Sequence, residues 1–147
     1  MPLRHSTVWD AEHTPVTEAR QAVRALLARA GHPPSHPTSQ DAQIVVSELV
    51  ANAYRHAPGP GALLLEVVPD AALLRISVSD SSPDPPEPRA HDAGRIGGHG
   101  LHLVSRLCAQ LNTVVSATGK KVVAHLRLHG TPADPVRQGA GAPMAGR

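Results

Sequence analysis

The chain has 147 residues, which is enough for one ordinary domain with a single hydrophobic core. Hydrophobic residues make up 41% and charged residues 18%, a globular balance, but phenylalanine is absent and Trp9 and Tyr54 stand alone as aromatic residues. The formal charge is only +2 and the arginines are scattered, whereas nucleic-acid binding needs clustered positive charge and stacking rings. We therefore expect an aliphatic core and no nucleic-acid partner.

The single cysteine and the lack of long apolar runs exclude further classes of protein. Cys108 alone excludes a disulfide framework or a cysteine-based zinc site, and it fits a small core residue. No apolar run approaches the roughly 20 residues of a membrane span, and no basic region followed by an apolar stretch opens the chain. We expect a cytoplasmic protein without a membrane segment.

The first half of the chain predicts one strand and two helices. Residues 3–9 fit a short edge strand. Thr14 and Pro15 have the form of an N-cap and a first helical residue, and the helix that follows is expected to stop at Gly31. Residues 39–56 predict a second helix, mostly buried because its interior is apolar nearly all round. The apolar face of the first helix consists of Val16, Ala19, Val23, Leu26, Leu27 and Ala30.

Two strands, 63–68 and 73–80, are predicted next, joined by a turn at Pro69 and Asp70. Apolar and polar residues alternate in the second of them, so Asp80 falls on its buried face. The stretch 81–95 is rich in proline and predicts a loop, and loops of this length in compact domains are usually lids or binding loops.

The remainder predicts a third helix that starts near Leu101 and extends to Leu111, with Cys108 inside its apolar pattern. Strands 112–118 and 121–128 follow, turned by Gly119. We expect one folded domain over residues 1–129 and a disordered tail over 130–147. The order of elements predicts an α+β fold, a two-layer sandwich of a mostly antiparallel sheet with helices on one face.

Three polar features break this apolar framework. Glu48 and Asn52 lie four residues apart on the second helix, where a buried carboxylate or amide is costly without a partner. They are either a hydrogen-bonded core pair, a stripe that reaches solvent, or part of a site. Asp80 is either a turn former or a binding group where a strand meets a loop.

The third feature is the glycine run Gly97, Gly98 and Gly100 ahead of the third helix, whose exposed amides suit a phosphate. No Gly-Lys-Ser/Thr follows, so the run is not a Walker motif, and the surroundings also exclude a dinucleotide-binding motif. His99 and His102 would need a third ligand to hold a metal, so solvated histidines are the favoured interpretation.

Together, these segments resemble the N, G1 and G2 boxes of the GHKL (histidine-kinase-like) ATPase domain, the Bergerat-type ATP-binding fold. They are Ser-Glu-Leu-Val-Ala-Asn-Ala-Tyr-Arg-His-Ala at 47–57, Ile-Ser-Val-Ser-Asp at 76–80, and Gly-Arg-Ile-Gly-Gly-His-Gly-Leu-His-Leu-Val at 94–104. The first is similar to the bacterial anti-sigma factor serine/threonine kinases, and the likeness spans about residues 15–128. Ser82 and Asp84 depart from it, because they stand where the wider fold usually has glycines.

The resemblance implies a role for each matching residue. Asn52 would be the ligand that holds Mg²⁺ against the phosphates of ATP, and Glu48 the catalytic base that activates the attacking hydroxyl. Asp80 would accept a hydrogen bond from the adenine amino group, and Asp80→Asn should weaken nucleotide binding with the fold intact. Arg55 would be a further phosphate contact. The remaining cofactor-binding positions are Gly97, Gly98, His99, Gly100 and Leu101.

The function that the resemblance implies is an ATP- and magnesium-dependent protein kinase of the anti-sigma type. It would phosphorylate a STAS-domain anti-anti-sigma protein, bind a sigma factor, and form a homodimer through the sheet side or the first strand. Mg²⁺ prefers hard oxygen ligands, and phosphoryl transfer asks mainly for positioning and charge neutralisation, so the residue types agree. Two alternatives remain: a nucleotide-dependent binding module without phosphoryl transfer, and a plain α+β protein with accidental motifs.

Overall fold

The computed structural model describes residues 3–10, 15–57, 59–68, 72–82 and 100–128, without the side chains of residues 100–102. The predicted order of strands and helices is confirmed. The elements are β1 (Leu3–Trp9), α1 (Val16–Arg29), α2 (Pro37–His56), β2 (Gly61–Val68), β3 (Leu73–Asp80), α3 (Gly100–Leu107), β4 (Gln110–Ser116) and β5 (Gly119–Arg127).

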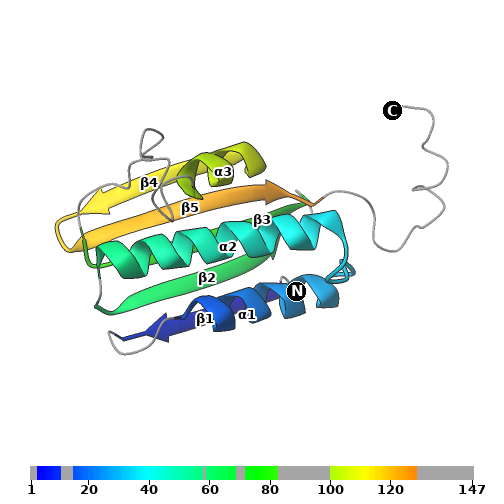
Figure 1. Cartoon of the computed structure of the whole chain (residues 1–147), viewed down its shortest axis with the longest axis horizontal. Helices are drawn as coiled ribbons and strands as arrows, with labels where there is room; N and C mark the ends of the chain where they lie inside the picture. Colours follow the sequence, from blue (N-terminus) through cyan, green and yellow to red (C-terminus); the bar gives the residue numbers. More distant parts are fainter. Residues whose placement is uncertain (1–2, 11–14, 58, 69–71, 83–99, 129–147) are drawn as a thin grey trace.

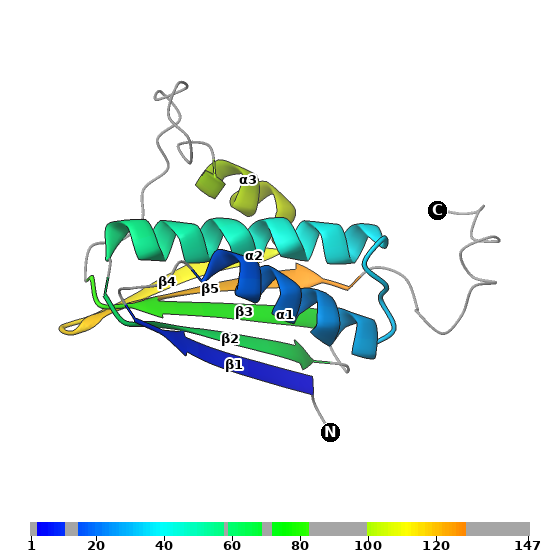
Figure 2. The same cartoon turned by 60° about the horizontal axis from the view of Figure 1, so that its bottom comes forward.

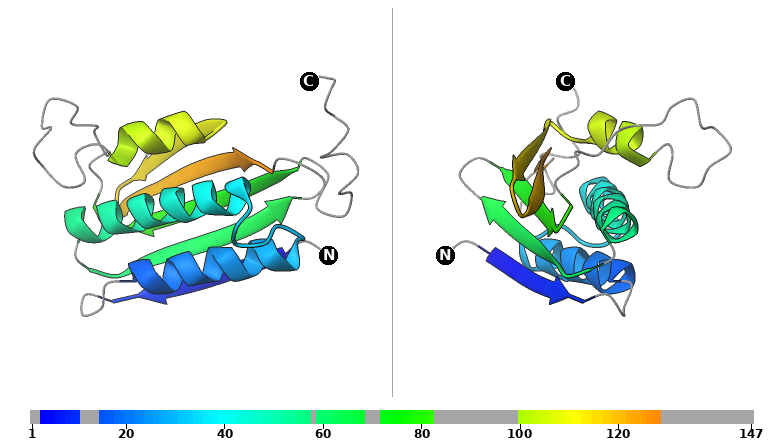
Figure 3. Two further views of the ribbon diagram at one scale, coloured as in Figure 1. Left: turned by 45° about the vertical axis from the view of Figure 1, so that its right-hand side comes forward. Right: turned by 90° about the vertical axis from the view of Figure 1, so that its left-hand side faces the viewer.

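The strands form one five-stranded sheet in the order β1-β2-β3-β5-β4, and every neighbouring pair is antiparallel. Figures 1 and 2 show the helices on one face of this sheet, with α2 between α1 and α3. The end-on view in Figure 3 shows the two layers directly. The predicted α+β class and one-sided helix layer are therefore confirmed.

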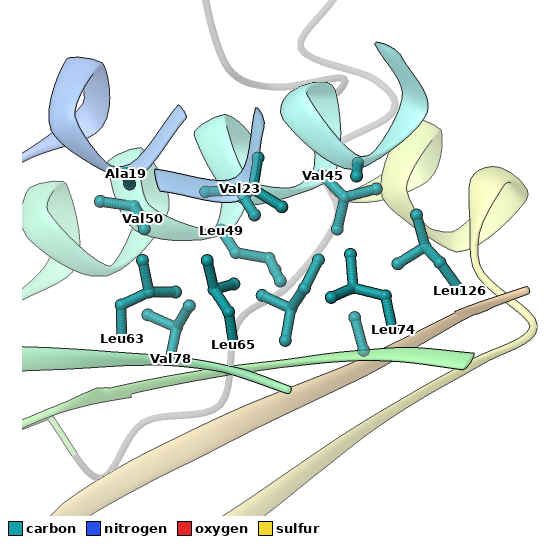
Figure 4. Packing of buried hydrophobic residues seen from close by; sticks show 14 of the residues in the cluster. Ala19, Val23, Val45, Leu49, Val50, Leu63, Leu65, Leu74, Val78 and Leu126 are labelled. Carbon is teal, nitrogen blue, oxygen red and sulfur yellow. The ribbon is translucent and has the colours of Figure 1, made fainter. Parts of the chain in front are cut away.

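The core lies between the sheet and the helices and is aliphatic, as the composition predicts. Leu63, Leu65 and Val67 of β2 are buried at alternate positions, and β3 continues the same layer. Figure 4 shows Val50 of α2 above Leu63, within this packed layer. Each fully buried side chain of this size stabilises the fold by roughly 1.5–3 kcal/mol, so the layer holds the helices firmly on the sheet.

The helix boundaries differ slightly from the predicted ones. Pro15 is the N-cap of α1 and not its first residue, and Thr14 lies outside the described residues. α2 starts at Pro37, two residues before the predicted Ser39. The imidazole Nδ1 of His36 accepts a hydrogen bond from the Thr38 backbone N–H at 3.1 Å, which caps the helix ahead of the proline.

The predicted third helix is too long at its C-terminal end. α3 ends at Leu107, and the Ala109 backbone N–H donates to the His125 carbonyl at 2.8 Å, which draws the chain into β4. Leu111 therefore belongs to a strand, because pairing with β5 overrides a spacing that also suits a helix. Cys108 follows the helix, half-buried against the core.

The last hairpin is offset by about two residues from its predicted position. Ser116 pairs with Gly119 across a two-residue loop, so the turn precedes Gly119 and β5 starts there, not at Lys121. This shift adds Lys120 to the sheet. The predicted turn at 69–70, most of the loop 81–95 and the predicted tail 130–147 lie outside the described residues.

Gly61 fits beneath the indole of Trp9, its partner across β1 and β2. A Cβ added at Gly61 would overlap the indole carbons Cζ2 and Cε2, whereas one added at Gly59 would meet, among the described residues, only the Ser81 hydroxyl at 3.7 Å. Since overpacking costs about 1–3 kcal/mol, we expect Gly61→Ala to lower the free energy of unfolding by that amount, and Gly59→Ala to change it little. Urea denaturation followed by Trp9 fluorescence measures both. Equal effects of the two variants would contradict the close packing.

Candidate functional site

The candidate residues gather at one end of the sandwich. Trp9 at the end of β1 lies opposite Gly61 at the start of β2, and Asp80 at the end of β3 lies opposite Lys120 near the start of β5. Figure 2 shows α2 ending at the same side, on the left of the view. Strand ends and a helix C-terminus therefore meet here.

Glu48, Asn52 and Arg55 lie along the C-terminal half of α2. Glu48 and Asn52 are half-buried, one helical turn apart, and Arg55 is exposed. The Arg55 Nη2 donates to the Asn52 Oδ1 at a long 3.4 Å. The pair is thus a stripe that reaches solvent and not a buried core pair. Burial of α2 likewise holds only for its face towards the sheet, since Ile44 is 38% exposed.

Asp80 lies on the buried face of β3, as its alternation with Leu74, Ile76 and Val78 predicts. Its side chain forms a buried ion pair with Lys120. The Lys120 Nζ donates to Oδ1 at 3.0 Å and lies 2.8 Å from Oδ2, and the two side chains are 1% and 2% exposed. Oδ1 also accepts a hydrogen bond from the Ser82 backbone N–H at 2.9 Å, which fixes the carboxylate at the strand end.

The sequence does not single out Lys120 as a site residue. Its ion pair with Asp80 changes the expected effect of Asp80→Asn on stability. Removing a single partner from a buried pair leaves the other charge uncompensated, which destabilises a protein strongly. The expectation that Asp80→Asn leaves the fold intact is therefore replaced by an expected loss of stability.

Gly119 lets β5 approach β3 closely beside this pair. Its φ is +157°, and an added Cβ would overlap the Asp80 carbonyl oxygen. Glycine tolerates both conditions, whereas other residues do not. The close approach brings Lys120 directly opposite Asp80.

An open pocket of about 420 Å³ lies at the same end of the sheet. Asp80 lines it together with Trp9, Gly61 and Thr118. Glu48 and Asn52 do not line it. They lie in the half of α2 that ends at this side of the domain, and the described residues do not place them in one pocket with Asp80.

The glycine run is only partly described. Gly97, Gly98 and His99 lie outside the described residues, as does the metal pairing considered for His99 and His102. Gly100 and Leu101 are the first residues of α3, so the run leads directly into a helix as predicted.

Neither a reactive cysteine nor a metal site built from protein side chains finds support in the described part of the chain. Burial raises the pKa of the Cys108 thiol to about 11, so it stays protonated and is a poor nucleophile at neutral pH. Within the described ranges, no group of three or more His, Cys, Asp or Glu side chains is arranged to hold a metal ion.

Among the same residues, no helix has the length and apolarity needed to cross a membrane.

The fold and the site define an α+β domain with helices on one face of an antiparallel sheet and a polar cluster at one sheet end. The profile of the histidine kinase-like ATPase domain matches residues 9–126, and the chain belongs to this family. No curated protein sequence matches the chain significantly.

Two of the solved structures that are similar to the chain illustrate the comparison. One contains the RsbU and RsbW domains of Rv1364c from Mycobacterium tuberculosis, with a TM-score of 0.62 and 21% identity over 84% of this chain and 32% of that one. The other is the histidine kinase domain of a blue-light activated histidine kinase from Erythrobacter litoralis, with a TM-score of 0.48 and 24% identity over 77% and 59% of the two chains. This chain thus spans less than two thirds of either structure, and the first likeness shows the shared fold.

Proposed function

We propose that this chain is an ATP-dependent serine/threonine protein kinase of the anti-sigma type. Its substrate would be a serine or threonine hydroxyl of a STAS-domain anti-anti-sigma protein, and a sigma factor would be a further partner. The observation that carries the proposal is the half-exposed Glu48 and Asn52 stripe in the C-terminal half of α2, a helix that ends at the same side of a histidine kinase-like ATPase domain as β3 with Asp80. A carboxylate and an amide in these positions suit proton transfer and metal–phosphate binding.

The residues present fit one magnesium ion. The Asn52 Oδ1 is a hard oxygen ligand, and its long contact to Arg55 is easily exchanged for a cation. When bound with ATP, the ion would neutralise charge on the phosphates. Arg55 itself, exposed and one turn away, suits a phosphate oxygen.

Glu48 would act on the protein substrate. Its carboxylate takes the proton of the attacking hydroxyl as that oxygen bonds to the γ-phosphorus and the bond to the departing ADP breaks. Asp80 would accept a hydrogen bond from the adenine amino group. The amides of Gly97, Gly98, His99, Gly100 and Leu101 would bind the phosphates in the same proposal.

A nucleotide-dependent binding module remains a second candidate, and one observation favours it. Asp80 is held by two donors, but within the described ranges no side chain pairs with the Glu48 carboxylate to orient it. The adenine-binding group is therefore held in place while the proposed catalytic base is not, which suits a site that binds the nucleotide without transferring a proton. A homodimer through the sheet side or β1 is compatible with either candidate.

Purified protein tests the proposal in two steps. Calorimetry is expected to show binding of Mg-ATP and Mg-ADP, and labelled γ-phosphate is then expected to appear on one of a panel of co-encoded STAS proteins. Absence of nucleotide binding would overturn both candidates. Binding of ATP and a STAS partner without transfer over hours would reject the kinase and leave the binding module.

A further inference from the structure

The buried ammonium of Lys120 has more donors than acceptors around it. An ammonium carries three N–H donors, and within the described residues Asp80 is the one side chain that pairs with it. The Lys120 side chain is 1% exposed, so bulk water cannot satisfy the remaining donors. Buried donors without acceptors are costly. The ion pair is therefore short of an acceptor.

Asp80 keeps capacity to accept. Its Oδ1 accepts from Ser82 and Lys120, and its Oδ2, 2.8 Å from the ammonium, has a further lone pair that no other group in the described part of the chain engages. The pair thus has a spare donor on Lys120 and a spare lone pair on Asp80, and Asp80 also lines the pocket at this end of the sheet. Both groups lie on the helix-facing side of the sheet, at the end where α2 finishes.

The geometry points to Lys120 as a specificity-determining residue for the nucleotide base, an inference that rests on the proposed ATP site. Lys120 donates to the ring nitrogen N1 of adenine while Asp80 Oδ2 accepts from the neighbouring amino group. The Watson–Crick edge of adenine carries its amino donor beside the N1 acceptor, which complements the Asp80 oxygen and the Lys120 ammonium. Proteins recognise bases by hydrogen bonds to this edge. Hypoxanthine and guanine have an acceptor and a donor in the reverse order, so the same pair disfavours them.

An ATP analogue in which N1 is replaced by C–H tests the contact. In the wild-type protein we expect this 1-deaza-ATP to bind roughly 10- to 100-fold more weakly than ATP, the range for a lost hydrogen bond to a charged group. Lys120→Met is expected to bind both nucleotides alike. Lys121→Met is the matched control, because Lys121 is the next residue on β5 but exposed, and it should discriminate as the wild type does. Calorimetry with Mg²⁺ gives each dissociation constant.

A second measurement needs no variant. The chain has two lysines, Lys120 and Lys121, so lysine-specific isotope labelling gives two resolvable side-chain NMR signals. The Lys120 signal is expected to shift on binding ATP and to shift less with 1-deaza-ATP, while the Lys121 signal serves as an internal reference.

The outcomes separate the inference from the proposed function. Equal affinity of the wild type for ATP and 1-deaza-ATP, an unmoved Lys120 signal, or discrimination that persists in Lys120→Met would each overturn the contact and leave the ATP site standing. No binding of ATP by the wild type would overturn the ATP site itself.

Discussion

Glu48→Gln is expected to slow phosphoryl transfer by roughly 10²- to 10⁴-fold while Mg-ATP affinity stays close to that of the wild type. Glutamine keeps the shape of the side chain but cannot take the proton from the attacking hydroxyl. The half-exposed position of Glu48 on α2 tolerates this exchange without a packing cost. Labelled-phosphate transfer to a STAS protein and calorimetry with Mg-ATP measure the two effects separately.

Asn52→Ala should fail in a different way. It removes the oxygen that would hold the metal, so nucleotide affinity and transfer are both expected to fall. The matched control for Glu48→Gln is Glu18→Gln, which removes a carboxylate charge from an exposed position in the first turn of α1. Transfer by Glu48→Gln at the wild-type rate would reject Glu48 as the base, and unchanged Mg-ATP affinity in Asn52→Ala would reject Asn52 as the ligand.

The sheet, its order of elements and its buried faces could be predicted because short-range patterns determine them. Alternation identifies the inner faces of β2 and β3, and it also places Asp80 on the inner side. The end of α3 could not be predicted in this way. The apolar spacing up to Leu111 suits a helix, and only pairing with β5, which is distant in sequence, decides for a strand.

Lys120 escaped prediction because β5 was expected to start at Lys121, two residues later than it does. Val122, Ala124 and Leu126 alternate on the buried face, and one more step back along this pattern reaches Lys120. A lysine at that position argues against burial unless a partner is known. The partner, Asp80, is forty residues away in sequence, and only the antiparallel register of β3 and β5 places it opposite.

The residues proposed for catalysis and for the phosphates also differ in how far the sequence could predict their positions. The predicted start of α3 near Leu101 follows from a glycine run before an apolar period, and the structure agrees to within one residue, with α3 starting at Gly100. The sequence alone could not decide how exposed Glu48 and Asn52 are, because polar residues four apart on a helix suit either a buried pair or a solvent-facing stripe. The way α2 packs between α1 and α3 decides it.

Asp80→Asn is expected to lower the free energy of unfolding by about 3–5 kcal/mol in the absence of nucleotide, because it leaves the Lys120 ammonium buried without a countercharge. That is a large part of the roughly 5–15 kcal/mol typical of a domain. Asp80→Asn combined with Lys120→Met removes both charges at similar volume, so the double variant should recover much of the loss. Urea denaturation followed by Trp9 fluorescence gives the four free energies of the cycle.

The outer face of the same sheet supplies the control for this cycle. Arg75 and Glu66 also pair across neighbouring strands, at 3.1 Å, but their side chains are 40% and 20% exposed. Exposed pairs contribute about 0–1 kcal/mol, so Glu66→Gln should cost far less than Asp80→Asn. Similar losses in Glu66→Gln and Asp80→Asn would contradict the view that burial makes the Asp80–Lys120 pair decisive. A double variant no more stable than Asp80→Asn alone would show that the cost arises from something other than the uncompensated ammonium.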